Sequence, residues 1–235
     1  MFLGKNAMHH WRRIYFLGVF VALLAFGSAN IPATVGDSGE LAVDCDAMID
    51  IHVPQNPQHA DFVMRVQFSQ RLVCLVRSEA VYRAFLSRVG LHEKYRREAI
   101  EGLARLHETT RLDAWFAAID RLDKHGVVLD PRQGTRRATS AENRLVLDAY
   151  ASLLTQWDKE ELKGARDALH GLIQQTKTPQ IRSLCYAGLL ESGVDPVVVW
   201  ELAAQRERGL ADLLGAGSWI PLPVRDVFWQ RCVES

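Results

Sequence analysis

From about residue 59 to the end of the chain, apolar positions recur with the 3.6-residue period of an amphipathic helix. The clearest stripe consists of Leu112, Trp115, Phe116, Ile119 and Leu122. The pattern predicts helices over residues 59–76, 78–89, 92–107, 110–124, 140–156, 159–175, 179–191, 196–206, 208–215 and 222–233. We therefore predict an all-α fold, with the tryptophans on these stripes in its core.

Helix-start signals separate the stripes. They are Thr139 with Glu142, Asp158 with Glu161, Thr178 before Pro179, and Asp195 before Pro196. The short connections favour antiparallel helix pairs, over residues 92–124, 140–175 and 179–206. These pairs recur about every 35 to 45 residues, which is the spacing of HEAT-like repeats. The rhythm predicts a HEAT-like α-solenoid of antiparallel helix pairs, and a compact helical bundle is the alternative.

Two segments lack the helical period. Residues 30–58 form a predicted linker before a helical-repeat domain over 59–235, and residues 49–53 alternate like a short strand. Residues 125–138 are rich in helix breakers and are expected to form an exposed loop. Arg132, Arg136 and Arg137 of this loop are candidates for contact with an anion or an acidic partner, against the plainer alternative of a solvated charged loop.

The N-terminal segment has the order of an export signal. Lys5, Arg12 and Arg13 precede an uncharged apolar run over residues 14–26, and small residues follow at 27–29. The run is shorter than a typical membrane span, so residues 1–29 are expected to be a cleaved signal peptide, with an inner-membrane anchor as the alternative. Either a signal peptide or an anchor places the rest of the chain in the periplasm or an equivalent extracytoplasmic space, where it contacts the membrane only through residues 1–29.

Charge and cysteine usage narrow the function classes. Lys and Arg number 28, as do Asp and Glu, so no overall basic surface is available for nucleic acid. None of the four cysteines lies in a C-x-x-C spacing, which removes the usual sign of haem attachment, thioredoxin-like chemistry or a zinc knuckle. An even number of cysteines in an exported chain permits disulfides. Cys74 and Cys185 fall among apolar residues of predicted helices, so buried free thiols are the favoured expectation for these two.

No catalytic, cofactor or metal site is identified from the residues. The sequence has no G-x-S-x-G, P-loop, G-x-G-x-x-G or H-E-x-x-H pattern. Asp44, Asp46, Asp50 and His52 form its densest oxygen and nitrogen cluster, but without EF-hand spacing the polar face of a short strand is the better interpretation.

Residues 91–104, with the run KYRREAIEGLA, and residues 118–123, with the run AIDRLD, carry a family resemblance. They resemble the helical segment of large exported, planctomycete-type multi-domain haem and copper proteins, and the resemblance covers about residues 73 to 233. It implies an exported setting associated with electron transfer. The chain departs from that family in having neither a C-x-x-C-H motif nor an upstream cupredoxin sequence, so no cofactor site is carried over.

These observations favour a non-catalytic exported helical scaffold or partner-binding module whose partner is another exported or membrane protein. The resemblance adds an association with an electron-transfer protein. The alternative is an enzyme or redox subunit whose site has no sequence signature.

Overall fold

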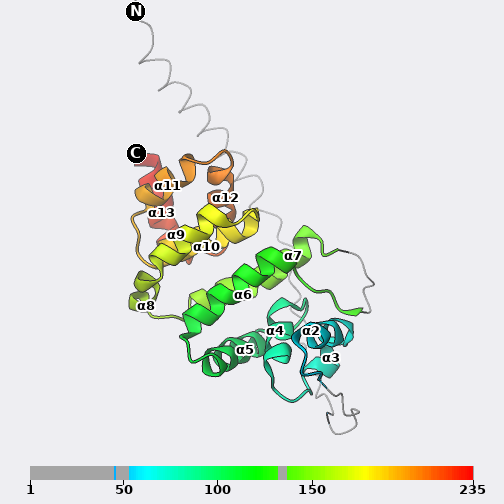
Figure 1. Cartoon of the computed structure of the whole chain (residues 1–235). Helices are drawn as coiled ribbons and strands as arrows, with labels where there is room; N and C mark the ends of the chain where they lie inside the picture. The colour runs from blue at the N-terminus through cyan, green and yellow to red at the C-terminus, as the bar shows by residue number, and fades with distance from the viewer. Residues whose placement is uncertain (1–44, 46–52, 132–136, 235) are drawn as a thin grey trace, which may run out of the picture. The chain divides into compact units, whose positions relative to one another are not determined.

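The computed structural model describes residues 45, 53–131 and 137–234, which belong to one compact unit spanning Val43–Ser235. The described part is all-α, as the sequence predicts, and contains a single isolated β-bridge between Arg88 and Val128. Its twelve helices are α2 (Pro57–Val66), α3 (Ser69–Leu72), α4 (Glu79–Ser87), α5 (Glu93–Leu106), α6 (Arg111–His125), α7 (Ser140–Leu154), α8 (Lys159–Gly164), α9 (Arg166–Gln175), α10 (Pro179–Glu191), α11 (Pro196–Ala204), α12 (Gly209–Ala216) and α13 (Leu222–Glu234) (Figure 1).

The starts of α7 and α8 follow from local hydrogen bonds. Thr139 and Glu142 form a capping box at α7, and Asp158 and Glu161 form one at α8, which confirms both predictions. Thr178 stands before α10 as expected, but its hydroxyl donates to Asp123 Oδ1 at 2.5 Å instead of capping the helix. The starts of α7 and α8 are thus local in origin, and sequence spacing could find them.

Two predicted helices are each divided into two. The helix expected over 59–76 ends at Val66, and Gln67 and Phe68 are extended before α3 begins at Ser69. The helix expected over 159–175 is interrupted at Ala165, directly after Gly164. Glycine lowers the cost of such an interruption because it has little helix propensity.

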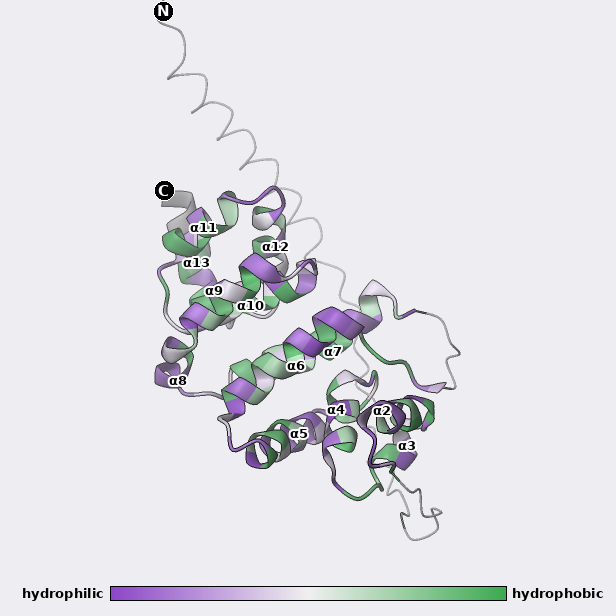
Figure 2. Ribbon diagram, viewed as in Figure 1, coloured by the Kyte–Doolittle hydropathy of each residue, from purple (hydrophilic) through white to green (hydrophobic). Residues whose placement is uncertain are grey.

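Apolar helix faces meet in one contiguous core that extends from Met64 to Phe228 (Figure 2). Trp115 is fully buried, and its indole Nε1 donates to the Tyr150 carbonyl at 3.3 Å. Its ring also packs edge-on against Trp157. The predicted core position is therefore confirmed, and these contacts lie on α7 and the turn that follows it.

Helix α10 lies at the centre of the C-terminal half. It packs against α7, α9 and α12, and also touches α8 and α11. In the N-terminal half, α4 packs against α2 and α5, and α5 against α6. These contacts leave α2, α4, α5 and α6 surrounding the candidate site described below.

Several predictions fall outside the described residues. These are the signal or anchor at 1–29 and the strand at 49–53, except that Val53 packs on the core. Among the described residues, none of the helices combines the length and the apolar character needed to cross a membrane.

Candidate functional site

The site begins with the segment after α6, which the sequence analysis took for an exposed loop. Its described first half instead docks on the end of α4: Val128 N donates to Ser87 O at 2.9 Å, and Val89 N donates to Val128 O at 3.0 Å. Leu129 is only 8% exposed. The prediction of an exposed loop was wrong for this half. It was based on the helix-breaking residues and gave no weight to the apolar run at residues 127–129, whose main chain pairs with the end of α4.

Arg88, directly after α4, connects α4 to α2 and to the segment after α6 through hydrogen bonds. Its side chain is 1% exposed, and its guanidinium donates to Leu129 O at 2.5 Å and to Met64 O at 2.7 Å. Burial lowers the pKa of Arg88, while the negative charge of Asp130 acts in the opposite direction. Arg88 Nε has no hydrogen-bond partner among the described residues. A buried guanidinium with an unused donor is unusual and marks this junction.

Arg96 of α5 is buried beside it. Arg96 is 2% exposed, and it donates to Arg88 O at 2.6 Å and also to Leu91 O. Burial lowers its pKa as well. Arg88, directly after α4, thus satisfies carbonyls of α2 and of the segment after α6, and Arg96 satisfies the carbonyl of Arg88 itself. Together they fix the end of α4 against α2 and α5.

Beside this junction lies a cleft of about 600 Å³ lined by residues of α2, α4, α5 and α6, the segment after α6 and Tyr150 of α7. Its wall is largely apolar, with many small side chains. The apolar lining residues include Ala80, Ala84, Leu103, Ala114, Ala117, Ala118 and Leu122. Tyr150 also lines the cleft, and its buried hydroxyl donates to Leu86 O at 3.3 Å. Alanines on α4 and α6 leave the space that larger side chains would fill.

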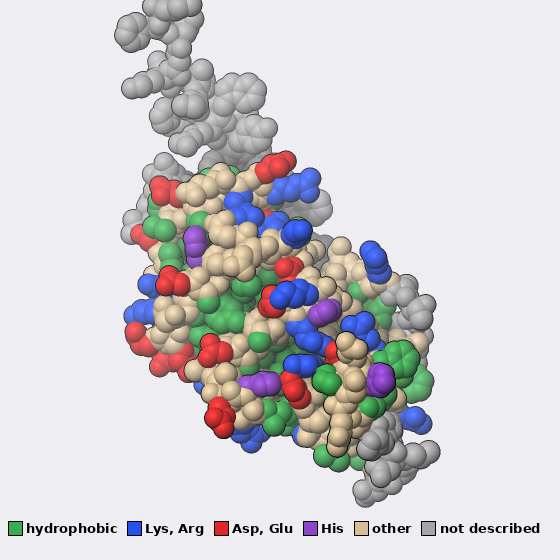
Figure 3. All heavy atoms as spheres, viewed as in Figure 1, with side chains coloured by type: hydrophobic (Ala, Val, Ile, Leu, Met, Phe, Trp, Pro, Cys, Tyr) green, Lys and Arg blue, Asp and Glu red, His purple; other side chains and the backbone are tan. Residues whose placement is uncertain are grey.

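Charged side chains surround this apolar wall. Arg121 pairs with Asp61, Lys124 with Asp120 at 2.6 Å, and Arg83 with Glu79. Asp113 belongs to the capping box of α6. On the face drawn in Figure 3, basic, acidic and histidine side chains lie close together around hydrophobic ones. The carboxylates around the cleft are thus already engaged by this chain's own donors.

Two positively charged residues of the cleft lining form no ion pair with a carboxylate of the described residues. One is the buried Arg88, and the other is the exposed Arg65 in the last turn of α2. Within the described part of the chain, no carboxylate forms an ion pair with either guanidinium, although Asp130 lies near enough to act on the charge of Arg88.

The histidines of the cleft are not assembled with a nucleophile. His107 Nε2 lies 3.2 Å from Glu79 Oε1, which also pairs with Arg83. The Ser87 hydroxyl instead donates to the carbonyls of Arg83 and Ala84, at 3.2 and 3.5 Å. Nucleophilic catalysis needs a base within hydrogen-bond reach of the nucleophile. No hydroxyl that lines the described cleft is hydrogen-bonded to a histidine.

Of the three arginines predicted as an anion or partner contact, Arg132 and Arg136 lie outside the described residues, and Arg137 is exposed. The aspartates of the predicted polar cluster and His52 also lie outside them. In the described part of the chain, no group of three or more His, Cys, Asp and Glu side chains is arranged to hold a metal ion.

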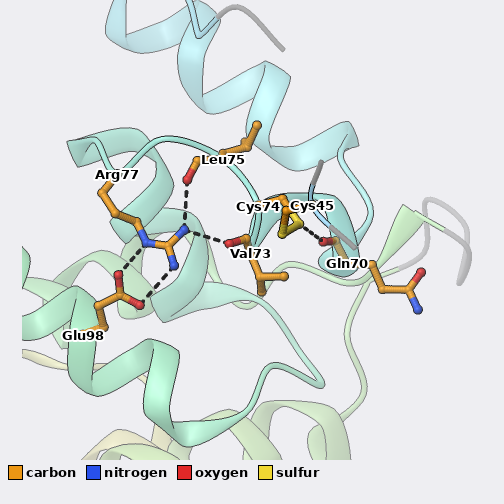
Figure 4. The surroundings of a disulfide bond; sticks show 7 residues. All are labelled: Cys45, Gln70, Val73, Cys74, Leu75, Arg77 and Glu98. Atoms are coloured by element: carbon orange, nitrogen blue, oxygen red, sulfur yellow. Dashed lines mark hydrogen bonds and ion pairs between the residues drawn. A yellow bond between two sulfur atoms is a disulfide. The ribbon is translucent and has the colours of Figure 1, made fainter. Parts of the chain in front are cut away.

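The cysteines correct one prediction and confirm another. Cys74 forms a disulfide with Cys45, with an S–S distance of 2.10 Å, so the prediction of a free core thiol was wrong (Figure 4). Arg77 lies nearby and donates to Val73 O and Leu75 O while it pairs with Glu98. Cys185 is a buried free thiol as predicted, and burial raises its pKa.

The cleft was missed in the sequence because its lining comes from residues 61 to 150 with no local motif. The alanine pairs at 80 and 84 and at 114 and 118 were a usable signal, since small residues at helical spacing leave room beside a helix. No family model, curated protein or solved structure matches the chain.

Proposed function

We propose that the chain is a non-catalytic extracytoplasmic binding module and that the cleft between α2, α4, α5 and α6 holds its ligand or partner. The cleft is the observation that carries this proposal: a concave, largely apolar site of about 600 Å³ with charged groups at its edge. Binding sites for small ligands are commonly about 300 to 1,000 Å³, with apolar walls and a few polar groups.

The chemistry of the lining favours binding over catalysis. Ion pairs engage the carboxylates of Asp61 and Asp120, and main-chain carbonyls accept hydrogen bonds from the hydroxyls of Ser87 and Tyr150. Groups engaged in this way can orient and select a ligand, but they are not arranged to attack one. An enzyme or redox subunit is the second candidate, with His107 beside Glu79 as its supporting observation.

The Cys45–Cys74 disulfide supports an extracytoplasmic location. Disulfides form and persist in oxidising compartments such as the periplasm. This agrees with the interpretation of residues 1–29 as a signal peptide or inner-membrane anchor. The partner is then another exported or membrane protein, or a ligand found in that compartment.

HEAT-like repetition and an electron-transfer setting remain part of the proposal. The packing of α5 against α6 supports the predicted pair over residues 92–124, whereas α9 packs mainly against α10 and not, as the predicted pair over 140–175 requires, against α7. The electron-transfer setting rests on the resemblance of residues 91–104 to exported haem and copper proteins. Stacked helix pairs commonly present concave surfaces to partners.

In-cell crosslinking tests the proposal. A photo-crosslinking amino acid at Ala117, which is exposed and lines the cleft, should capture a discrete partner or ligand. The same group at Ala168, exposed on α9 and remote from the cleft lining, is the control. Equal capture at both positions would contradict the cleft as the binding site. A visible spectrum and metal analysis of the purified protein complete the test, since stoichiometric haem or copper would favour the redox alternative.

A further inference from the structure

We infer that the cleft binds an anionic amphiphile, a small molecule with an apolar chain and a carboxylate head, and that Arg88 and Arg65 recognise the head. The inference rests on the proposed function and names the ligand class of the same site.

The apolar chain is inferred from the wall of the cleft. Alanines of α4 and α6 face it, together with Leu103 and Leu122, and they offer no hydrogen-bonding group to a ligand. A sugar or another polyhydroxylated ligand would lose its hydrogen bonds to water on such a wall without replacement. A hydrocarbon chain loses no hydrogen bonds there and removes apolar surface from water.

The negative head is inferred from the cations that remain after the internal ion pairs are formed. Both terminal nitrogens of Arg88 donate to main-chain carbonyls, and its Nε is the donor left without a partner. Asp130 acts on the charge of Arg88 without pairing with it, so the Arg88 Nε–H remains a charged donor that a ligand carboxylate in the cleft would engage. Arg65 adds an exposed positive charge on the same lining.

The volume favours a small molecule over a folded partner. A cavity of about 600 Å³ is of the size that encloses a single small ligand, whereas stable protein interfaces extend over about 800 Å² on each partner. A partner that inserts only one acidic side chain is therefore an outcome to be tested and not the inference.

Calorimetric titration of the purified, disulfide-bonded protein with matched probes tests the head group. Octanoate should bind with one-to-one stoichiometry, about tenfold more tightly than octanamide, because a charged head makes the stronger hydrogen bonds. Octylamine, which has the same chain and the opposite charge, should bind more weakly than octanamide. Octanamide binding equal to that of octanoate would overturn recognition of the anion.

Two variants locate the site without disturbing the buried junction. Ala117→Phe places a ring at the cleft and should abolish octanoate binding, whereas Ala168→Phe on α9 should leave it unchanged. Arg65→Gln should weaken octanoate binding about two- to fivefold, as expected for an exposed charge. Arg71→Gln, at an exposed arginine of α3 outside the cleft lining, is its control.

Arg88 is tested without substitution, because it holds α2 and the segment after α6 in place. The NMR resonance of the Arg88 Nε–H should shift on addition of octanoate and stay in place with octylamine. An unmoved resonance would remove Arg88 from the recognition of the head.

Failure of this inference is separable from failure of the proposed function. If no probe binds while crosslinking at Ala117 still captures a protein, the inference of an anionic amphiphile is wrong, whereas the proposal that the cleft binds a partner is supported. If no probe binds and crosslinking at Ala117 captures nothing above the Ala168 control, both are wrong.

Discussion

Asp130, in the segment that follows α6, holds the start of α3: its Oδ2 accepts hydrogen bonds from Ser69 N at 2.8 Å and from Ser69 Oγ at 2.7 Å. The two residues are 61 positions apart, so a distant side chain caps this short helix. The contact joins α3 to the same segment whose Leu129 carbonyl accepts from Arg88.

Asp130→Ala should therefore lower the free energy of unfolding by about 1 to 2 kcal/mol, as loss of a helix cap and of a charged acceptor usually does. Urea denaturation followed by circular dichroism measures the change. Asp167→Ala, at an exposed aspartate of α9, is the control and should have a smaller effect. Equal effects would mean that the Ser69 contact contributes little to stability.

Trp115→Ala should cost about 3 to 5 kcal/mol, because the fully buried indole leaves a cavity as well as lost apolar burial. Phe62 is 65% exposed, and Phe62→Ala should change stability by less than about 0.5 kcal/mol. Thermal unfolding of the two variants gives the comparison. An unchanged melting temperature for Trp115→Ala would remove this residue from the core.

Two glycines allow a matched test of helix packing. A Cβ at Gly102 of α5 would overlap the ring of Tyr82, whereas one at Gly171 of α9 would meet open space. Gly102→Ala should therefore destabilise the fold by about 1 to 3 kcal/mol through overpacking. Gly171→Ala should stabilise it by about 0.5 to 1 kcal/mol through helix propensity. Chemical denaturation of both variants measures whether each substitution raises or lowers the free energy of unfolding. Stabilisation by Gly102→Ala would show that α4 and α5 have room to separate.

The ion pair between Arg182 of α10 and Asp212 of α12 is buried, with Nε and Oδ2 2.6 Å apart. Asp212→Ala leaves the arginine charge without its carboxylate and should cost about 3 to 5 kcal/mol. Replacing both residues, as Arg182→Met with Asp212→Leu, should cost less than Asp212→Ala alone. A double-mutant cycle built from Arg182→Met, Asp212→Leu and the double variant measures the coupling energy. Additive effects of the two single substitutions would show that the pair does not interact energetically.

The proposed export depends on the apolar run at residues 14–26. Leu24→Arg should oppose membrane insertion by roughly 2.5 to 3.5 kcal/mol and retain the protein in the cytoplasm. Cell fractionation should show retention, and thiol trapping should find Cys45 and Cys74 reduced, because the cytoplasm keeps thiols reduced. Leu24→Ile is the matched control, and normal export of Leu24→Arg would refute the signal.

Sequence reasoning was sufficient where the cause of a structure is local. Thr139 and Glu142 carry a complete capping box within four residues, so the start of α7 could be predicted. It failed where the cause is distant: Ser69 begins a new helix because Asp130 is beside it, and Cys74 pairs with a cysteine 29 positions away. Arg88 and Arg96 were missed because arginine in a sequence ordinarily indicates surface, and only the fold reveals the carbonyls that they satisfy. The cleft is a product of those same distant contacts.

The disulfide also determines how the body would respond to mechanical tension. Cys45 and Cys74 close a covalent loop that contains α2 and α3. A pulling force applied to the chain before Cys45 therefore passes through the sulfur bridge to Cys74 and on towards α4. Helix α2 lies outside that load path, so the wall that it contributes to the cleft bears no direct load while the bridge is intact.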